Sequence, residues 1–201
     1  KYGENFARDY KEMDLKAFSQ GMQDGFKGSK PAMEEKEIMA VMQAFQTRKM
    51  EEMRGKAEKQ ASENKTKGAA FLAENGKRKG VTTLPDGLQY EVLASGKGAT
   101  PKETDKVKVH YHGTLIDGTV FDSSVQRGEP VTFGVNQVIK GWTEVLQKMK
   151  VGDKWKVAIP SDLAYGERAV SEAIGPNETL VFEIELLDIE PAAKADAAPA
   201  K

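Results

Sequence analysis

The residues of this chain that are able to do chemistry are mostly aromatic. Tyr111, Phe121, Asp122 and the segments 138–142 and 164–166 place rings and apolar side chains where most enzymes place polar catalysts. The sequence has no cysteine, only two histidines, no G-x-S-x-G motif and no glycine-rich phosphate loop. The pattern therefore predicts an apolar pocket that acts through its shape and through the exclusion of water.

The two histidines do not form a convincing metal site. His110 and His112 are two residues apart, so they share one face of a predicted strand. A zinc site needs three or four protein ligands, and the chain offers no third histidine and no cysteine. We therefore expect both rings to lie on a solvated surface, and we expect neither a metal nor another cofactor.

The overall charge excludes several functions. Thirty basic and 31 acidic residues give a net charge of -1, so no global field favours nucleic acid, which we do not expect as a partner. No apolar run approaches the roughly 20 residues of a membrane-spanning helix. The absence of cysteine fits an oxidising compartment. The first residues read as the middle of a helix without an initiator Met, so we expect a leader upstream.

The first half of the chain predicts helices. Asp14 is suited to cap a helix that ends at Gly28 and presents Leu15, Phe18, Met22 and Phe26 on one face. A turn follows at 29–31. The stretch 33–75 contains no proline and is rich in strong helix formers, so we expect one helix about 60 Å long.

Seven of the eight methionines precede Arg54, and Ile38, Val41, Met42, Phe45 and Met53 form an apolar face of the long helix. A homodimer through the N-terminal helices would bury this face, at about 1.5–3 kcal/mol for each fully buried anchor. Two alternatives stay open. Met22, Met39, Met42 and Phe45 form a small core within one chain, or the methionine surface holds unfolded clients.

The second half predicts an antiparallel sheet. Residues alternate in 88–92, in 106–112, in 155–159 and in 180–186, with Val107, Val109 and Tyr111 on one face of the second run. Asp117-Gly118 predicts a turn. Trp142, Val145, Leu146 and Met149 are spaced for one face of a short helix that ends near Gly152. The fold class is therefore α+β, with a sheet wrapped on one helix.

Several motifs in unbroken order carry a resemblance to a known family. They are 109–113 (VHYHG), 117–118 (DG), 121–124 (FDSS), 138–142 (VIKGW), 163–166 (LAYG) and 179–182 (TLVF). From about Gly87 to Glu190 the chain resembles the FKBP-type peptidyl-prolyl cis/trans isomerases. The long helix, with 63–65 (ENK) and 68–72 (GAAFL), is similar to that of the bacterial macrophage infectivity potentiator (Mip)-like and FkpA-like group.

The resemblance implies a set of pocket residues. Tyr111, Asp122 and Tyr165 are the implied catalytic residues. The implied substrate-binding residues are Phe121, Arg127, Phe133, Val138, Ile139, Trp142, Ile174 and Phe182. In the family, the indole at Trp142 forms the pocket floor, and the Ile139 amide and the Tyr165 hydroxyl bind substrate carbonyls.

Other interpretations of these residues are simpler. Tyr111, Phe133, Trp142 and Phe182, taken singly, read as core residues, and only their joint spacing favours a site. Asp122 and Arg127 are equally explained as a structural ion pair.

The chain departs from the family at the pocket rim. Val131 stands where an aromatic residue is common, and Val170 stands where small single-domain relatives carry histidine. Residues 171–173 replace a loop rich in glycine and proline. The resemblance therefore implies a conserved pocket floor with an altered rim.

The resulting expectation is a peptidyl-prolyl isomerase that assists protein folding and has chaperone activity. The alternatives are a holdase chaperone and a proline-peptide-binding module with little turnover. The expected partners are proline-containing unfolded or nascent polypeptides, a second copy of the chain, and macrolides of the FK506 and rapamycin type. The resemblance places the protein in the bacterial periplasm or at the outer membrane. The expected domains are a helical dimerisation region with its connecting helix at 1–78, the FKBP-type domain at 79–190 and a disordered tail at 191–201.

Overall fold

The computed structural model describes residues 13–29, 33–171 and 173–190. Pro31 of the expected turn, Glu172 of the rim segment and the expected disordered tail lie outside the described residues. The chain divides into two compact units, 1–53 and 54–201, and each is described by itself. Within the described parts, no helix has the length and apolar character needed to cross a membrane.

Helix α2 (Leu15–Phe26) forms where the sequence predicts it. The carboxylate of Asp14 accepts hydrogen bonds from the backbone N–H groups of Lys16 at 2.9 Å and Ala17 at 3.1 Å, so it satisfies two of the free donors at the helix start. Gly28 follows the helix in the left-handed region, with φ of 66°. None of the α2 side chains is buried in this single chain.

Helix α3 (Glu35–Asn75) is a single run of 41 residues, about 60 Å long, and confirms the predicted long helix. Its surface carries ion pairs one turn apart, such as Arg54–Glu58 at 3.1 Å. Pairs of this kind each stabilise an exposed helix by only about 0.3–0.5 kcal/mol. The first half of α3 belongs to the first compact unit and the second half belongs to the second.

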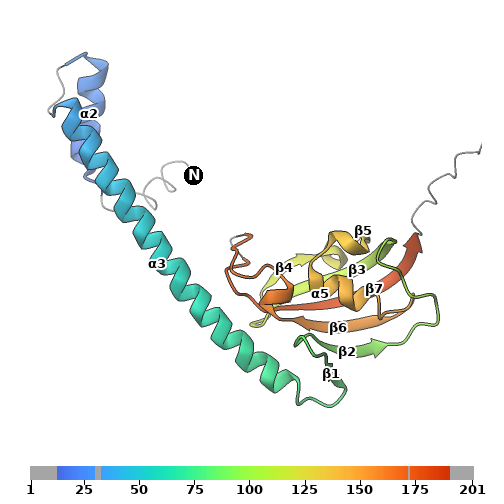
Figure 1. Cartoon of the computed structure of the whole chain (residues 1–201). Helices are drawn as coiled ribbons and strands as arrows, with labels where there is room; N and C mark the ends of the chain where they lie inside the picture. Colours follow the sequence, from blue (N-terminus) through green and yellow to red (C-terminus); the bar gives the residue numbers. More distant parts are fainter. Residues whose placement is uncertain (1–12, 30–32, 172, 191–201) are drawn as a thin grey trace, which may run out of the picture. The chain divides into compact units, whose positions relative to one another are not determined.

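The second unit is built on one antiparallel sheet (Figure 1). Its strands are β1 (Val81–Thr83), β2 (Gln89–Ala94), β3 (Lys106–Leu115), β4 (Val120–Ser123), β5 (Val131–Gly134), β6 (Lys154–Ile159) and β7 (Leu180–Glu190). The order across the sheet is β1-β2-β6-β7-β3-β4, and β5 pairs with β3 beside β4. The four predicted strands are confirmed as β2, β3, β6 and β7, and β4 follows the predicted turn at 117–118. Strands β1 and β5, each of three or four residues, were not predicted.

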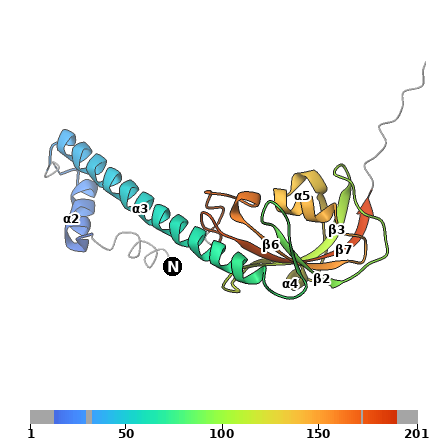
Figure 2. The same ribbon diagram turned by 60° about the horizontal axis from the view of Figure 1, so that its bottom comes forward.

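Four short helices interrupt or follow the strands. They are α4 (Ser124–Arg127), the 3-10 turn η1 (Val135–Gln137), α5 (Lys140–Leu146) and the 3-10 turn η2 (Ser161–Leu163). Figures 1 and 2 both show α5 on one face of the sheet. This arrangement confirms the α+β class with a sheet wrapped on one helix.

The core lies between α5 and the sheet. Val145 and Leu146 of α5 are fully buried there, as are Val107 and Val109 of β3. Burial alternates along β3, so Tyr111 faces the core as the sequence predicts. Apolar burial of this kind contributes about 25 cal/mol per Å² and supplies most of the stability of the unit.

The prediction that the short helix ends near Gly152 is wrong. Helix α5 ends at Leu146, and the chain then forms turns in which Met149 is still fully buried. The carboxylate of Asp153 accepts hydrogen bonds from the N–H groups of Lys150 at 2.8 Å and Gly96 at 2.6 Å. These bonds fix the turn, so tertiary contacts end the helix before the sequence pattern does.

The second half of α3 packs against the loop that precedes β7. The buried Asn64 amide donates to the Pro176 carbonyl and to Glu178, both at 2.9 Å. Near the end of the helix, Gln89 of β2 donates to the Leu72 carbonyl at 2.8 Å. The domain limits at residues 78 and 190 stay a prediction, and these contacts explain why the compact unit begins earlier, within α3.

Two glycines on α3 give a matched test of this packing. A Cβ at Gly68 would lie 2.3 Å from Thr179 Oγ1, whereas a Cβ at Gly55 meets nothing within 4 Å. We expect Gly55→Ala to raise the free energy of unfolding by about 1 kcal/mol through helix propensity. We expect Gly68→Ala to lower it by about 1–3 kcal/mol through overpacking.

Thermal and urea unfolding of the full chain measure both changes. Thr179→Ala should recover part of the loss in a Gly68→Ala background, because it removes the clashing atom. Equal effects of the two glycine substitutions would contradict the packing described here.

Candidate functional site

A cavity of about 420 Å³ opens between α5 and the sheet. Its volume lies in the range of small-molecule and peptide side-chain sites. The lining side chains come from six strands and helices and from two connecting segments. They are Tyr111, Phe121, Asp122, Phe133, Gln137, Val138, Ile139, Trp142, Tyr165 and Phe182.

The structure brings together nine of the eleven residues expected from the sequence. Arg127 does not line the cavity but contacts two residues that do, Tyr111 and Asp122. Ile174 lies in the hydrophobic core, with 8% of its surface exposed. Gln137 lines the cavity and was not predicted, although it directly precedes the expected pair at 138–139.

Trp142 stands at the centre of the aromatic lining. The rings of Tyr111, Phe133 and Phe182 meet the indole edge to face at centroid distances of 5.4, 5.8 and 5.2 Å. Each such contact is worth about 0.5–1.5 kcal/mol beyond the burial of area. The indole N–H is buried without a hydrogen-bond partner in the described part of the chain, so packing alone holds the ring.

Gly113 makes room for two of the rings. A Cβ at this position would lie 2.7 Å from Phe121 and 2.9 Å from Phe182, closer than carbon atoms approach without displacement. The two phenyl rings meet at 5.5 Å and 84° directly beside it. The glycine that follows His112 is therefore required by the pocket wall rather than by a turn.

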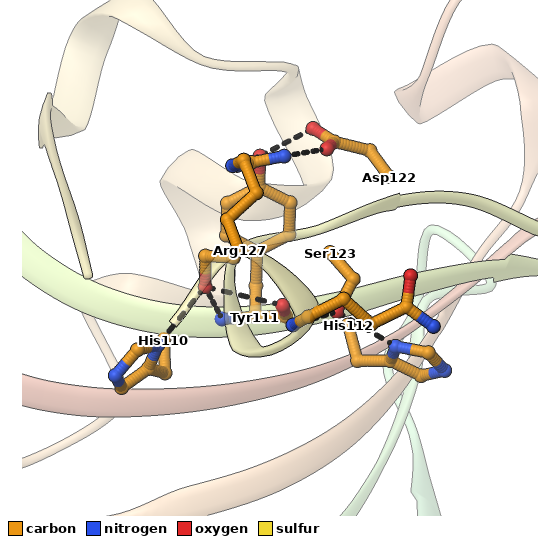
Figure 3. Close-up of polar contacts among 8 residues, drawn as sticks. His110, Tyr111, His112, Asp122, Ser123 and Arg127 are labelled. Carbon is orange, nitrogen blue, oxygen red and sulfur yellow. Dashed lines mark hydrogen bonds and ion pairs between the residues drawn. The ribbon is translucent and has the colours of Figure 1, made fainter. Parts of the chain in front are cut away.

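Tyr111, Asp122 and Arg127 form a polar cluster at the edge of the cavity (Figure 3). The Tyr111 hydroxyl donates a short hydrogen bond to one oxygen of Asp122, and Arg127 donates to the other oxygen. Arg127 also donates to the Tyr111 oxygen at 3.0 Å. The cluster is therefore closed, since each member bonds to the other two.

The cluster fixes the charge of its members. Burial, followed by the hydrogen bond to Asp122, raises the pKa of Tyr111 above its usual value of 10.0. Burial also acts to raise the pKa of Asp122, but hydrogen bonds from Tyr111 and Arg127 outweigh it and lower this pKa below 3.8. The hydrogen bonds to Tyr111 and then Asp122 raise the pKa of Arg127. Near neutral pH, the phenol is protonated and the other two side chains are ionised.

Two residues that line the cavity carry a hydrogen-bond donor without a partner in the described residues. The backbone N–H of Ile139 precedes α5, and the hydroxyl of Tyr165 belongs to a side chain that is 38% exposed. Both are able to donate a hydrogen bond to a carbonyl group. The site thus combines apolar walls with a few placed donors, and its one carboxylate is already bonded.

The residues at the predicted rim occupy different environments. Val131 on β5 is half-buried and packs against the hydrophobic core. Val170 is 51% exposed, and its N–H donates to the Ile174 carbonyl at 3.0 Å. Neither residue lines the cavity.

A wrapped antiparallel sheet with an aromatic cavity over a short helix defines a class of isomerase, and comparison with known proteins agrees. Residues 97–187 match the model described as "FKBP-type peptidyl-prolyl cis-trans isomerase". Residues 1–92 match the model described as "Domain amino terminal to FKBP-type peptidyl-prolyl isomerase".

Individual relatives cover nearly the whole chain. Outer membrane protein MIP of Legionella longbeachae is 47% identical over 95% of this chain and 82% of its own length. FkpA of Escherichia coli strain K12 is 44% identical over 99% of this chain and 74% of its own length. The chain therefore belongs to the FKBP-type peptidyl-prolyl cis-trans isomerases, and it is similar to their Mip and FkpA members.

Solved structures show the same fold. The crystal structure of FkpA from Escherichia coli matches 96% of this chain and 91% of its own, with a TM-score of 0.79 and 43% identity. A peptidyl-prolyl isomerase from Pseudomonas syringae pv. tomato matches 65% of this chain and 96% of its own, with a TM-score of 0.61 and 38% identity.

The polar cluster predicts two opposite shifts in the Tyr111 titration. Asp122→Asn should lower the pKa of Tyr111, because the carboxylate that favours the protonated phenol is gone. Arg127→Leu should raise the pKa of Tyr111, because the guanidinium favours the phenolate. NMR of ring-labelled tyrosine follows each titration, with a Tyr111→Phe chain to assign the signal. Shifts of the same sign in both variants would contradict the cluster.

Proposed function

We propose that this chain catalyses cis/trans isomerisation of X-Pro peptide bonds in unfolded or nascent polypeptides. Family membership supports the reaction class, and the observation that supports the site is the aromatic cavity around Trp142. We propose Tyr111, Asp122 and Tyr165 as the catalytic residues, and the remaining cavity residues as the groups that bind substrate.

The reaction needs no general acid or general base. Rotation about a peptide bond is opposed by amide resonance, with a barrier of about 18–20 kcal/mol. Uncatalysed X-Pro rotation takes tens to hundreds of seconds, and no covalent bond breaks in it. A planar amide is more dipolar than a twisted one, so water stabilises the ground state more. A cavity that replaces water with aromatic faces therefore favours the twisted state.

The geometry supports distinct roles for the lining residues. The prolyl ring would rest on the Trp142 indole between Phe121 and Phe182, whose rings are already fixed by edge-to-face contacts. The free N–H of Ile139 and the hydroxyl of Tyr165 would hold substrate carbonyls on either side of the rotating bond. Binding energy from these flanking contacts is then available to favour the twist.

The polar cluster would act on the rotating bond from the side. Asp122 is held by Tyr111 and Arg127, so the carboxylate presents a fixed negative field to the substrate carbonyl region without accepting a proton. Arg127 would keep this orientation without touching the substrate, since it does not line the cavity. Ile174 would support the neighbouring loop from within the core.

Two buried tryptophans allow a matched test of the site. Trp142 lines the cavity, whereas Trp155 stacks on Tyr90 at 4.4 Å elsewhere in the core. We expect Trp142→Leu to lower kcat/KM for an X-Pro peptide about tenfold or more, which corresponds to about 1.4 kcal/mol of lost transition-state stabilisation. Trp155→Leu should cost similar stability but leave kcat/KM per folded molecule unchanged.

The assay uses the full chain, with the folded fraction taken from near-UV circular dichroism. Absence of rate acceleration by the parent chain at micromolar concentration would sink the enzyme proposal. Peptide binding without acceleration would favour the alternative of a proline-peptide-binding module. Competition by rapamycin in the same assay tests the proposed binding of macrolides of the FK506 and rapamycin type.

We also propose that the N-terminal helices form a homodimer. In this single chain, many large apolar side chains of α2 and α3 are exposed, and gathered apolar side chains on a surface mark sites of protein interaction. Their exposed fractions are Leu15 68%, Met22 50%, Phe26 89%, Met39 66%, Met42 53%, Met50 66% and Met53 69%. Because Met22, Met39 and Met42 are exposed in the single chain, a dimer with a second copy is favoured over a small core within one chain.

A charge placed in this face tests the dimer. The full chain should scatter light as two copies of 22.0 kDa, that is 44.0 kDa. Met42→Glu with Phe18→Glu should shift the mass to 22.0 kDa, because each buried carboxylate would lack a partner. Leu93→Glu, at a 46% exposed position on β2, is the control and should keep the dimer mass.

The same variant addresses chaperone activity, which we propose for the apolar side chains of α2 and α3 that the dimer leaves accessible. A holdase that depends on these side chains should lose suppression of client aggregation in the double glutamate variant while its peptide isomerase rate stays the same. Equal suppression by both proteins would count against a client surface on α2 and α3. For location we propose the bacterial envelope, supported by the similarity to outer membrane protein MIP of Legionella longbeachae, and cell fractionation tests it.

A further inference from the structure

Behind the cavity, β3 carries two histidines that the proposed function does not use. Figure 3 shows the rings of His110 and His112 on the side of the strand opposite to the Tyr111 phenol. His110 Nδ1 lies 3.1 Å from the Ser124 hydroxyl, and His112 Nδ1 lies 3.0 Å from the Ser123 hydroxyl. Both serines are buried, with at most 3% of their surface exposed.

The Ser124 hydroxyl makes three hydrogen-bond contacts, and two of them are to the backbone of Tyr111. Its hydroxyl oxygen accepts from the Tyr111 N–H at 2.8 Å, and the hydroxyl donates to the Tyr111 carbonyl at 3.2 Å. A hydroxyl has one donor and two acceptor positions, so with its hydrogen on the Tyr111 carbonyl it accepts from His110 Nδ1 in the remaining position. A neutral ring with its hydrogen on Nδ1 and a protonated ring both donate this bond. The Ser124 contact therefore tolerates a change in the charge of His110.

The hydrogen-bond roles at Ser123 are opposite to those at Ser124. Its oxygen accepts from the Gln126 N–H at 3.2 Å, which caps the start of α4. Within the described chain, the acceptor in reach of its hydroxyl hydrogen is His112 Nδ1, and a neutral ring with its hydrogen on Nε2 accepts this bond. Protonation of His112 would turn Nδ1 into a donor and leave a buried hydroxyl hydrogen without an acceptor.

The cap matters because α4 is a single turn. The helix has four residues, Ser124–Arg127, and Ser123 supplies its side-chain cap. Its last residue, Arg127, reaches from α4 to Asp122 and to the Tyr111 oxygen. A helix this short has almost no stability of its own, so its cap and its packing decide where the guanidinium lies.

We propose that His112 and Ser123 are positioning residues of the isomerase site. Neutral His112 accepts the hydroxyl hydrogen of Ser123, orients that serine to cap α4, and thereby holds Arg127 on Asp122 and Tyr111. The inference rests on the proposed isomerase function, and it adds a polar layer behind the pocket that the catalytic set does not include.

Charged groups surround this layer on all the packed strands. Opposite His112 in the register is Glu183 of β7, and opposite His110 is Glu185. Three more charged side chains belong to the strands on this face: Lys108 of β3, and Lys154 and Lys156 of β6. On the pocket side of the sheet, the charged groups are Asp122 of β4 and Arg127 of α4. Lys154 pairs with Glu183 at 3.7 Å, so the acidic residue opposite His112 is shared with a cation.

The layer makes the site sensitive to pH although the reaction moves no proton. The pKa of Tyr111 is raised above 10.0 and that of Asp122 is lowered below 3.8, so neither changes charge between pH 5 and 8. Histidine is the side chain that does change charge in this range. Since the His110 contact tolerates protonation, the pH dependence falls to His112.

The test compares the pH profile of the full chain with that of two His112 variants. In a protease-free assay on an end-blocked tetrapeptide with one Leu-Pro bond, wild-type kcat/KM should fall about fivefold from pH 8 to pH 5, the scale of a lost helix cap. His112→Asn places an acceptor oxygen near the position of Nδ1 and does not titrate, so its profile should be flat at the wild-type pH 8 level. His112→Leu should be about fivefold lower at every pH.

Thr114→Val is the matched control, since Thr114 lies on the same face of β3 and its hydroxyl donates to the Val181 carbonyl at 3.5 Å. It should keep the wild-type profile. If wild type and His112→Asn share one profile, whether flat or falling, the inference is overturned. That comparison decides the matter even if His112→Leu fails to fold. A wild-type chain without activity at pH 8 would overturn the proposed function as well, and so is a distinct result.

An Arg127→Ala background gives a second readout. If His112 acts through Arg127, then His112→Leu should cause no further loss of kcat/KM there, while it should still cause its fivefold loss in the parent chain. Equal losses in both backgrounds would show a general structural effect and overturn the positioning role.

Discussion

Edge-to-face packing of three rings around the Trp142 indole is the constraint on which the rest of the second unit depends. The three partners come from β3, β5 and β7, so the indole can be enclosed only if these strands curve around α5. Curvature in turn requires the register shifts along β3, between Lys108 and Val109 and again between Gly113 and Thr114. The cavity is what remains above the indole when the rings cannot approach further.

Strand β3 serves two layers at once because its side chains alternate. One face gives Val107, Val109 and Tyr111 to the core and the cavity, and the other gives the histidines that contact the serines at the start of α4. The sequence 121–124 continues this division, since Phe121 and Asp122 line the cavity and the two serines turn the chain into α4. A displacement of β4 relative to β3 would therefore change both the cavity lining and the histidine–serine contacts behind it.

The sequence predicted most of this arrangement where a local pattern is strong. The alternation in 106–112, the proline-free run of α3 and the Asp14 cap each have a period or a signal that needs no tertiary information. Strands β1 and β5 were missed because three or four residues show no period, and their pairing partners decide their structure. Helix α5 was predicted too long because the Asp153 turn is a tertiary feature.

For the site, family motifs identified the lining residues but not the distances among them. Arg127 was expected either to bind substrate or to form an ion pair with Asp122. In the structure its guanidinium donates to Asp122 and to Tyr111, so the ion pair is present at the edge of the site. Ile174 was expected to bind substrate by resemblance to the family; its side chain lies in the hydrophobic core, and its role stays a prediction. Such orientations follow from packing across the sheet, which a single sequence does not display.

The polar cluster and the aromatic cavity are compatible because the cluster neutralises itself. Asp122 and Arg127 cancel in charge, and Tyr111 stays protonated, so an apolar substrate meets a directed field without a net charge to desolvate. The lowered pKa of Asp122 contributes stability at every pH above about 3.8, and this is lost only as the pH falls through the lowered folded value. The two histidines lie on the other face of β3, one residue away from Tyr111 in sequence but separated from the cavity by the strand itself. Separation of this kind allows the chemistry to proceed in a fixed protonation state while the support behind it responds to pH.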